Sequence, residues 1–502
     1  MNQHHAHQLR VKDIGIDAYL EIIAYLRADS HVCKSDGFTA HARLLVEANG
    51  NRIIATLNVV QGDFLTPGEV GLSSAALGRL QVKDGDKVCI SHHPPNLSFS
   101  RVRAKMNGEE LNRADFDAIL NDVVAGRYAS IELAAFLATC AGNRLCLPEI
   151  VALTQAMISS GQRIVWDEPM IVDKHCIGGL PGNRTTPIVV GIAAAAGLTI
   201  PKTSSKAITS PAGTADVMET MTTVDLSVER IREVVSRVGG CLAWGGAVGL
   251  SPADDILIHI EKALDIDSEG QTIASVLSKK AAAGSTHVVI DIPVGATAKV
   301  HTLEDAVKLK YEFNTVASTI GLEVEVVITD GTQPVGRGIG PALEAMDVLR
   351  VLRNEADAPE DLRDRALLLA AKVLECSGRF SKQDAVQIAS EMLYSGKALA
   401  KFMAICEAQG GFKEPQTAEF RHGCTATQSG TVAAVDNRNL ARIAKLAGAP
   451  RSPAAGIQYL APIGRIVRQG DLLFTIHASS QGELDYAMDF LGTLPNLIRI
   501  ES

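Results

Sequence analysis

The sequence predicts an α/β protein: a helical domain and a large α/β domain with a mixed sheet, flanked by an N-terminal β-rich domain and a C-terminal α+β module. Apolar residues make up 46% of the chain and aromatic residues only 4%, a composition typical of enzymes built from Ala, Val, Ile and Leu. At roughly 150 residues per domain, 502 residues suggest about three domains. Strand-like and helical patterns alternate after residue 164, which favours a parallel or mixed sheet flanked by helices.

Four segments follow from the pattern. Residues 1–100 alternate short apolar runs with turn residues, and Asn49-Gly50 between two such runs is a strong hairpin signal. Residues 101–165 carry apolar side chains at helical spacing. Residues 166–410 contain the clear strands VVIDIPV and VEVVITD, and IVVGIAAAAG (188–197) fits either a strand or a helix. Residues 411–502 return to short strands with glycine turns and form a C-terminal β-rich module.

Charge and composition exclude several classes of function. The formal net charge is −9, without long runs of one sign, which argues against a protein that binds nucleic acid polymers. No stretch reaches the 18 apolar residues of a membrane span, and MNQHHAHQLR lacks the apolar core of a signal peptide. The nine cysteines form no C-x-x-C pair, as expected for reduced thiols. We therefore expect a cytoplasmic protein with no membrane partner.

The first candidate for chemistry is the glycine-rich string DKHCIGGLPGNRTT, residues 173–186, which follows an apolar run and precedes a helical one. Glycines let backbone N–H groups approach an anion, and a helix N-terminus adds a favourable dipole. Lys174 supplies a positive charge, and Thr185 and Thr186 supply hydroxyl donors. The string fits a phosphate cradle and a ligand-free strand-to-helix turn equally well, and it is not a Walker loop.

Two further clusters are rich in donors. Residues 203–214 (TSSKAITSPAGT) contain six hydroxyl groups and a lysine; such a run alone is more often a solvated turn, but two loops separated by one helix can converge on one phosphate. In WGGAVGLSPADD, Asp254 and Asp255 are explained equally well as helix-start acids or as site residues. Ser275 and Lys279 lie four residues apart on one helical face, shortly after Asp267. That spacing alone is common and favours no function.

In this order, DKHCIGG, SSKAITSPAGTAD, WGGAVGLSPADD, ASVLSKK and GRGIGPALEA resemble the thymidine/pyrimidine-nucleoside phosphorylase family. The inserted P-G-N is most similar to its AMP phosphorylase and type 2 thymidine phosphorylase branch. The resemblance covers the chain from residue 103 onward. It implies reversible phosphorolysis, in which phosphate attacks C1′ of the sugar and releases the free base. It further implies no metal or organic cofactor, inorganic phosphate as co-substrate, and a homodimer or larger homo-oligomer.

The resemblance also assigns roles to individual positions. The catalytic group comprises Asp267 as proton donor, Lys279 at the leaving base, and His175. The phosphate contacts are Lys174, Thr186, Ser205 and Thr214. The substrate contacts are Gly179, Ser205, Lys206, Ala207, Ile208, Thr209, Ser210, Ser275, Lys279 and Lys299.

Three departures from the family pattern concern the substrate. Cys176 replaces the usual serine, and Pro181 is an extra residue relative to ordinary thymidine phosphorylases. The arginine that grips the base there is replaced by His259, Ile260 and Glu261.

Lys174 is kept, although AMP phosphorylases lack a lysine before this histidine. We therefore expect phosphorolysis of thymidine to thymine and 2-deoxyribose 1-phosphate. The alternative is a nucleoside 5′-monophosphate phosphorylase that yields ribose 1,5-bisphosphate, with Lys206 and Lys299 as cations for the second phosphate. A non-catalytic nucleotide-binding protein is the third, least favoured hypothesis.

Overall fold

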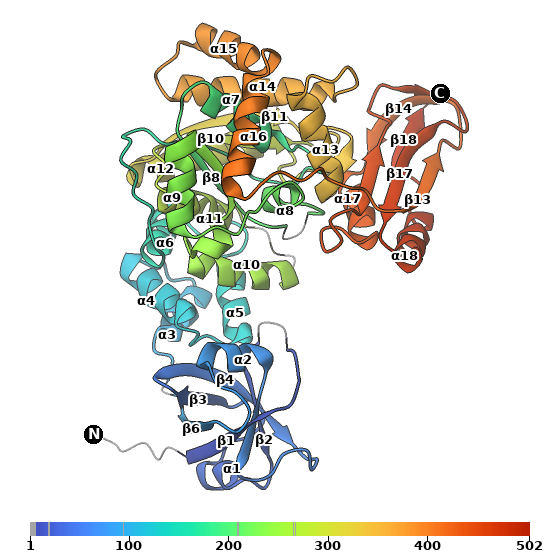
Figure 1. The fold of residues 1–502 in the computed structure, drawn as a ribbon. Helices are drawn as coiled ribbons and strands as arrows, with labels where there is room; N and C mark the ends of the chain where they lie inside the picture. The colour runs from blue at the N-terminus through green and yellow to red at the C-terminus, as the bar shows by residue number, and fades with distance from the viewer. Residues whose placement is uncertain are drawn as a thin grey trace. The chain divides into compact units, whose positions relative to one another are not determined.

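A computed structural model describes residues 7–18, 21–93, 95–207, 210–264, 266 and 268–501 (Figure 1). The chain divides into two compact units. The first comprises Met1–Glu109 and Ala118–Phe136, and the second comprises Glu110–Asp117 and Leu137–Ser502. The units are described separately below.

The first unit contains a closed β-barrel with strand order β1-β5-β2-β4-β3-β6. A hairpin joins β3 to β4, with Ala48 opposite Asn51. Asn49 and Gly50 both have positive φ, 53° and 80°, as a two-residue turn of this kind requires. The predicted hairpin is therefore confirmed. The barrel consists of β1 (His7–Asp13), β2 (Ile23–Arg27), β3 (Arg43–Ala48), β4 (Asn51–Val60), β5 (Glu69–Leu72) and β6 (Lys87–His92), with helices α1 (His31–Asp36) and α2 (Ser74–Leu80).

The region from residue 99 to 159 is helical, as the apolar spacing predicts. It consists of α3 (Phe99–Met106), α4 (Arg113–Val124), α5 (Ser130–Cys140) and α6 (Leu147–Ser159). In α4, Phe116, Ile119 and Leu120 lie on one face and are fully buried. The boundary between the two units falls within α4 and α5.

Two parallel sheets form the centre of the second unit. One has the order β11-β10-β7 and the other pairs β8 with β9. Every pairing within these two sheets is parallel, one of the two arrangements that the alternation predicts. The strands are β7 (Val172–Cys176), β8 (Ile200–Ser204), β9 (Gly240–Trp244), β10 (His287–Val294) and β11 (Glu323–Asp330), so VVIDIPV and VEVVITD are strands as expected.

Helices surround these sheets in the second unit (Figure 1). They are α7 (Thr185–Ala195), α8 (Thr214–Glu219), α9 (Val228–Val238), α10 (Pro252–Leu264), α11 (Glu269–Ala282), α12 (Leu303–Thr319), α13 (Pro341–Leu352), α14 (Glu360–Cys376), α15 (Lys382–Tyr394) and α16 (Lys397–Gln409), with the 3-10 turn η1 (Gly245–Val248).

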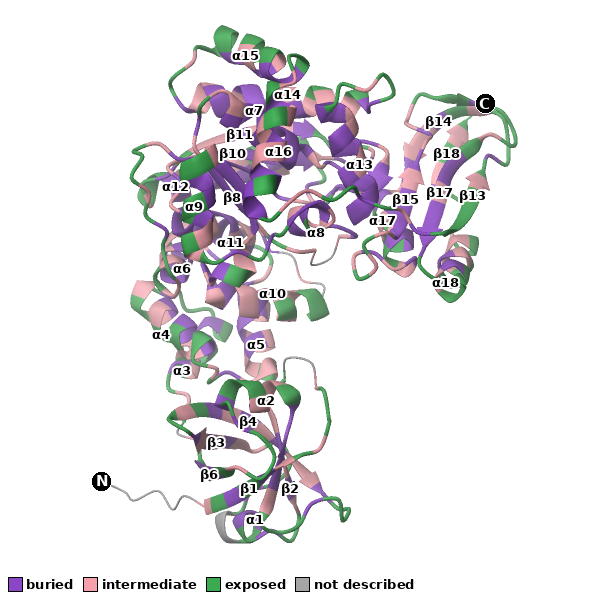
Figure 2. Cartoon of the chain, in the orientation of Figure 1, coloured by how far each residue is buried: buried purple, intermediate pink, exposed green. Residues whose placement is uncertain are grey.

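The run that fitted either a strand or a helix, 188–197, lies almost entirely in α7. Ile188, Val189 and Val190 are fully buried, and α7 packs against α14 and α16 in the main core (Figure 2). A helix covered on all sides needs no polar face, so its sequence carries no amphipathic period.

The C-terminal part combines strands with two helices, which confirms the α+β class. One sheet has the order β12-β15-β17-β13 and another the order β16-β14-β18. The elements are β12 (Gly338–Ile339), β13 (Phe420–Thr425), β14 (Gly430–Val435), β15 (Gly456–Tyr459), β16 (Ile466–Val467), β17 (Leu472–Ala478), β18 (Ile498–Glu501), α17 (Asn437–Leu446) and α18 (Gln481–Gly492). Because β12 precedes α13, its pairing with β15 ties this module to the α/β part.

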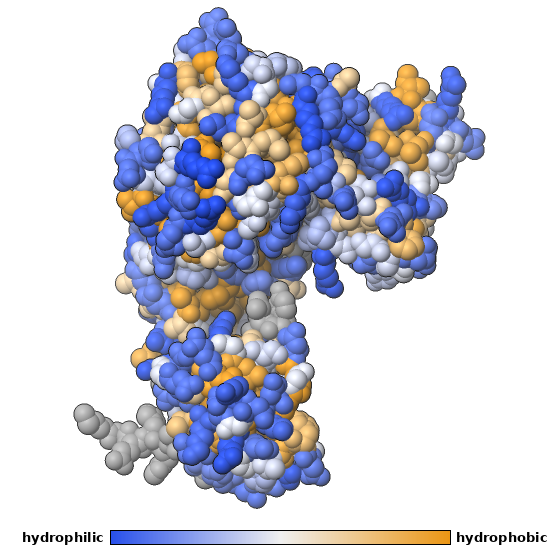
Figure 3. Space-filling view, in the orientation of Figure 1, coloured by the Kyte–Doolittle hydropathy of each residue, from blue (hydrophilic) through white to orange (hydrophobic). Residues whose placement is uncertain are grey.

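Polar side chains cover most of the face drawn in Figure 3, and hydrophobic side chains lie between them in small patches. Within the described residues, no helix combines the length and apolar character needed to cross a membrane.

Candidate active site

The middle of β7 places Lys174 in the interior. Its side chain is fully buried, its Nζ donates to Thr185 Oγ1 at 2.8 Å, and the same Nζ lies 3.8 Å from Asp291 Oδ2. A buried ammonium group needs such partners because burial removes its hydration. Thr185, one of the hydroxyl donors of the predicted cradle, thus positions this lysine, and the contact of Lys174 with phosphate stays a prediction.

Asp173, one residue earlier, anchors two lysines that sequence reasoning missed. Its Oδ2 lies 2.7 Å from Lys280 Nζ, and its Oδ1 lies 3.3 Å from Lys202 Nζ. Burial alone would raise the pKa of the Asp173 carboxyl, but the two ammonium groups lower it below its usual value. Neither lysine stands out in the sequence, because Lys202 is followed by three hydroxyl residues and Lys280 follows Ser278 and Lys279.

His175 lies in a strongly positive environment. Burial, followed by the charges of Lys280, Lys202, Lys279 and Lys174, lowers the pKa of its imidazole well below the ordinary value. The ring is therefore neutral at pH 7. These four lysines are paired with only three carboxylates, those of Asp173, Asp254 and Asp291, and this small excess of positive groups favours an anion.

Asp291 on β10 organises the opposite side of Lys174. Its Oδ1 accepts from Thr329 Oγ1 at 2.6 Å, and its Oδ2 accepts from Asn183 Nδ2 at 3.3 Å. Asn183 Nδ2 also lies 3.4 Å from Cys176 Sγ. Burial, then the Asp291 charge, raises the pKa of the Cys176 thiol to about 11, so the thiol is neutral at pH 7.

The Gly-Gly turn after β7 lies directly against Lys299. Gly178 and Gly179 have φ values of 88° and 82°. A Cβ on Gly179 would lie 2.4 Å from Lys299 Cβ and 2.5 Å from its backbone nitrogen. Lys299 Nζ in turn donates to Thr272 Oγ1 on α11 at 3.0 Å. The structure thus brings together Gly179 and Lys299, two predicted substrate contacts 120 residues apart in the sequence.

On α11, Ser275 and Lys279 share a face as the spacing predicts. Lys279 Nζ donates to Ser275 Oγ at 3.3 Å and lies 2.6 Å from Asp254 Oδ2 on α10. Asp254 therefore lies in the first turn of α10, as one of the two explanations predicts, and its ion pair with Lys279 leaves its role in the site a prediction. Burial, followed by the neighbouring Asp254 charge, raises the pKa of Asp255 to about 6.

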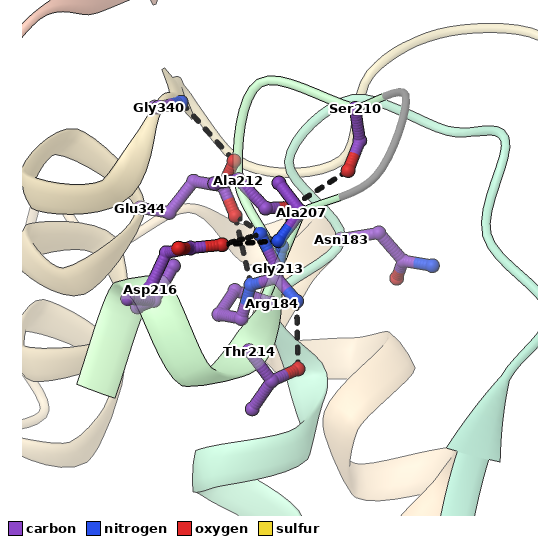
Figure 4. Close-up of polar contacts among 12 residues, drawn as sticks. Asn183, Arg184, Ala207, Ser210, Ala212, Gly213, Thr214, Asp216, Gly340 and Glu344 are labelled. Carbon is purple, nitrogen blue, oxygen red and sulfur yellow. Dashed lines mark hydrogen bonds and ion pairs between the residues drawn. The ribbon is translucent and has the colours of Figure 1, made fainter. Parts of the chain in front are cut away.

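Arg184 connects the first loop to the second (Figure 4). Its Nη1 donates to Thr214 Oγ1 at 2.7 Å, its Nη2 donates to the Ala212 carbonyl at 2.9 Å, and its Nε donates to Glu344 Oε2 at 2.8 Å. The two loops therefore meet, and their convergence on one phosphate stays a prediction. Of the side chains that join them, the sequence analysis singled out Thr214 but not Arg184 or Glu344. Arg184 lies inside the first motif and Glu344 inside the GPALEA string, but 160 residues separate them.

Asp216 holds the second loop closed in the same view (Figure 4). Its Oδ2 accepts from the backbone nitrogens of Ala207 and Gly213, at 2.6 Å and 2.8 Å. Ser210 Oγ donates to the Ala212 carbonyl at 3.1 Å. The described residues of the hydroxyl-rich run, 203–207 and 210–214, are thus held partly by contacts with one another and with Asp216.

Lys206 lies at the edge of this loop. Its Nζ lies 2.8 Å from Glu219 Oε2 and 4.9 Å from the centre of the Trp244 ring. Ser205 is exposed, and Thr186 is buried in the first turn of α7. The predicted site residues Ile208, Thr209 and Asp267 lie outside the described residues.

Two buried polar atoms near the loops make no hydrogen bond with the described residues: Ser204 Oγ and Asn183 Oδ1. They add hydrogen-bonding capacity to a region that already has an excess of ammonium groups. The described residues contain no group of three or more His, Cys, Asp or Glu side chains arranged to hold a metal ion.

Comparison with known proteins first defines the class. Residues 168–399 match the α/β domain of a glycosyl transferase family, and residues 101–161 match its helical bundle domain. Anthranilate phosphoribosyltransferase from Thermus thermophilus has a similar fold, with a TM-score of 0.50, 19% identity and coverage of 61% of this chain and 98% of that one. The Saccharomyces cerevisiae enzyme, in complex with PRPP and Mg, gives a TM-score of 0.51 at 15% identity, covering 63% and 98%. Together with its family matches, this fold makes the protein a pentosyltransferase.

Further matches identify the family within the pentosyltransferases. Residues 431–493 match the C-terminal domain of pyrimidine nucleoside phosphorylases. A protein of Acidovorax sp. (strain JS42), provisionally named thymidine phosphorylase 1, is 55% identical over 100% of this chain and 98% of its own length. One from Hahella chejuensis (strain KCTC 2396), provisionally named thymidine phosphorylase, is 54% identical over 100% and 99%. The chain belongs to the thymidine/pyrimidine-nucleoside phosphorylase family.

Proposed function

We propose that this protein catalyses the reversible phosphorolysis of thymidine to thymine and 2-deoxyribose 1-phosphate. The observation that carries the proposal is the position of Lys279. Its ammonium group acts on His175 together with three other lysines, and it also contacts Ser275. It thus links a positive region suited to phosphate with the Ser-Lys pair expected to hold a pyrimidine. The curated relatives provisionally named thymidine phosphorylases support the same substrate.

The proposed chemistry needs no metal or organic cofactor. An oxygen of inorganic phosphate forms a bond to C1′ as the bond from C1′ to the base nitrogen breaks, and the electron pair leaves with the base. The positive charge that develops on the sugar is stabilised by the phosphate dianion itself. The departing base takes up a proton, and a positioned acid or cation lowers the cost of that step.

In our proposal, one set of residues binds phosphate, and another set binds the nucleoside and protonates the departing base. Lys174, Thr186, Ser205 and Thr214 hold phosphate, with Arg184 fixing the Thr214 hydroxyl. His175 and Gly179 line the nucleoside pocket. Asp267 supplies the proton, and Lys279 with Ser275 holds the base.

A second candidate is phosphorolysis of nucleoside 5′-monophosphates. It is favoured by the absence of the base-gripping arginine at His259, Ile260 and Glu261. It is also favoured by two lysines beside the loops, Lys206 over the Trp244 ring and Lys299 against Gly179. Either could meet a second phosphate group.

The experiment is a substrate panel. Purified protein is incubated with phosphate and with thymidine, uridine, cytidine, AMP, CMP or UMP, and free base is measured by chromatography. We expect phosphate-dependent release of thymine from thymidine. Release from the nucleotides alone would replace thymidine by a 5′-monophosphate as the substrate, and binding without release from any of them would contradict the activity itself.

The phosphate assignment has its own test. Lys174→Met keeps the volume of the side chain and removes its charge, so we expect the KM for phosphate to rise and kcat/KM to fall roughly 100-fold, as when one transition-state donor is lost. Lys397→Met, at an exposed lysine paired with Glu391, is the matched control. Because the variant leaves the buried Asp291 carboxylate without its cation, thermal unfolding must confirm the fold. An unchanged phosphate KM would remove Lys174 from the phosphate site.

We also propose a cytoplasmic homodimer or larger homo-oligomer. All nine cysteines are free thiols, as expected for a reducing compartment. Sedimentation measures the assembly directly.

A further inference from the structure

A second charged pocket lies at the junction of the α/β part and the C-terminal module. It has a volume of about 170 Å³ and is lined by Arg337, Gly338, Leu343, Met346, Asp347, Arg350, Thr417, Arg421, Gln458 and His477. None of these residues belongs to the predicted phosphorylase site. The pocket therefore requires its own explanation.

Strand register brings the polar side of this pocket together. Arg421 on β13 is directly opposite His477 on β17, and Gly338 on β12 is directly opposite Gln458 on β15. Directly opposed residues of antiparallel strands place their side chains on the same face of the sheet. Helix α13 supplies the facing wall through Leu343, Met346, Asp347 and Arg350, which are among the lining residues.

The lining is strongly cationic, with three guanidinium groups against one carboxylate. Asp347 is held by other residues of the pocket wall: its Oδ2 accepts from the backbone nitrogens of Arg337 and Gly338, each at 2.6 Å. Its Oδ1 lies 3.5 Å from Arg350 Nη1. Arg337 pairs with Asp361 at 3.2 Å, outside the lining. Arg350 Nε also lies 4.0 Å from Asp357 Oδ2. Arg337 and Arg350 therefore both have carboxylate partners, and the remaining positive charge of the pocket comes from Arg421.

Arg421 contributes this remaining charge. It donates to the Thr417 hydroxyl at 2.8 Å and to the Ala418 carbonyl at 3.2 Å, and it forms no ion pair with any carboxylate among the described residues. A guanidinium group held only by neutral acceptors retains its full charge. Its planar set of donors matches the oxygens of a phosphate group.

His477 provides the second, independent observation. It is 3% exposed, and apart from a weak contact with the Ala418 backbone neither ring nitrogen makes a hydrogen bond with the described residues. A buried polar group without a partner costs free energy. The imidazole lines the pocket, where an anion would accept a hydrogen bond from its N–H. Burial and then the Arg421 charge lower the pKa of His477 to about 4, although the Ala418 carbonyl opposes the shift, so the ring is neutral at pH 7.

We infer that this pocket binds a phosphate group, either inorganic phosphate or the phosphate of a small monoester, through Arg350, Arg421 and His477. The volume of about 170 Å³ admits a phosphate with a short attached group and excludes a polymer. Helix α13 also carries Glu344, which holds Arg184 in the predicted active site, so one helix contributes to both sites. The inference does not depend on which nucleoside is the substrate.

The test is equilibrium dialysis of the full chain with radiolabelled inorganic phosphate. We expect two sites per chain in the native protein. Arg350→Gln combined with Arg421→Gln removes hydrogen bonds to a charged group at one site, and we expect phosphate to bind there about 10- to 100-fold more weakly. Arg499→Gln, at an exposed arginine of the same module paired with Glu501, is the matched control and keeps both sites.

Separate variants distinguish the two sites. In Lys174→Met the site defined here remains and still binds one phosphate. His477→Gln, which leaves every arginine in place, weakens binding at the same site as the arginine pair. Unlabelled ribose 5-phosphate displacing the label at lower concentration than phosphate identifies a monoester as the natural ligand, and the reverse order identifies inorganic phosphate.

The inference is overturned if the double arginine variant binds as many phosphates as the native protein, or if Lys174→Met binds none. The native protein could also bind a single phosphate, and the combination of Arg350→Gln and Arg421→Gln could abolish that binding. This result would support the inference and would contradict the phosphate role of Lys174. Failure of the proposed function and failure of this inference therefore give different results.

Discussion

At the scale of the residue, Glu344 shows how burial competes with an ion pair. Its carboxylate is 1% exposed, accepts from Arg184 Nε at 2.8 Å and accepts from the backbone nitrogen of Gly340 at 3.1 Å. Burial nevertheless outweighs the attraction of Arg184 and raises the pKa of Glu344 to about 7. The loss of hydration thus exceeds what one guanidinium and one amide return.

This raised pKa predicts a pH dependence of stability. Between its usual value near 4.5 and the folded value of about 7, Glu344 binds more proton in the folded than in the unfolded chain. Its contribution to the free energy of unfolding is therefore full below the unfolded pKa and is lost as pH rises through the folded one, on the order of 3 kcal/mol. Urea denaturation from pH 5 to 8 should show this fall in the native protein and not in Glu344→Gln.

The difference between the pH slopes of the native protein and Glu344→Gln removes the contributions of other titrating groups, including Asp255, because both proteins contain them. Glu391→Gln removes an exposed carboxylate paired with Lys397 and is the control, with a pH slope like that of the native protein. Parallel slopes for the native protein and Glu344→Gln would contradict the raised pKa.

At the scale of the element, the turn after β7 depends on two glycines for different reasons. Both have positive φ, but nothing lies within 4 Å of a Cβ on Gly178, whereas a Cβ on Gly179 would lie 2.5 Å from the Lys299 backbone nitrogen. Gly178 therefore serves only the backbone conformation. Gly179 also permits the close approach that brings Lys299 to the loop.

We predict that Gly178→Ala and Gly179→Ala differ. The first costs about 1–2 kcal/mol, since only the left-handed conformation is strained. The second adds the displacement of Lys299, about 1–3 kcal/mol more by analogy with overpacking, and should also lower kcat/KM. Thermal denaturation and initial rates of both variants test this. Equal losses in the two would show that the Lys299 contact does not shape the loop.

At the scale of the whole second unit, a short strand pair is one of several contacts that tie the C-terminal module to the α/β part; Asn437 and Ile463 also make hydrogen bonds across this junction. Gly456 on β15 lies so close to β12 that a Cβ would be 2.1 Å from the Ile339 carbonyl oxygen. Gly464 in the same module has a φ of 88° with nothing within 4 Å of its Cβ position. A side chain at Gly456 would therefore disturb the contact between the two parts, whereas a side chain at Gly464 would strain only its own turn.

We predict that Gly456→Ala disrupts the β12–β15 pairing, whereas Gly464→Ala leaves it intact. Calorimetry of Gly456→Ala should show the C-terminal module unfolding below the rest of the unit. Because the second phosphate pocket spans the same junction, its phosphate binding should weaken too. An unchanged calorimetric trace would mean that the junction does not rest on this pairing.

Sequence patterns predicted the elements that depend on interactions between neighbouring residues in the chain. The Asn49-Gly50 turn predicts its hairpin because two positive φ angles are cheap there, and the apolar strings of β10 and β11 are short and β-branched. The run 188–197 carried no decisive period because tertiary burial on all sides replaced an amphipathic face. In the site, the Ser275–Lys279 contact followed from helical spacing, whereas Asp254 as the lysine's partner did not.

By itself, the sequence determined the class of fold, the strands and turns whose patterns are local, and the five ordered motifs that mark the phosphorylase family. Only the tertiary structure decided which charges meet. Arg184 and Glu344 pair across 160 residues, Lys202 and Lys280 share Asp173, and Arg421 faces His477 across a strand pair. The reason is physical: a buried charge is tolerated only beside its partner, and chain folding, not spacing along the chain, selects that partner.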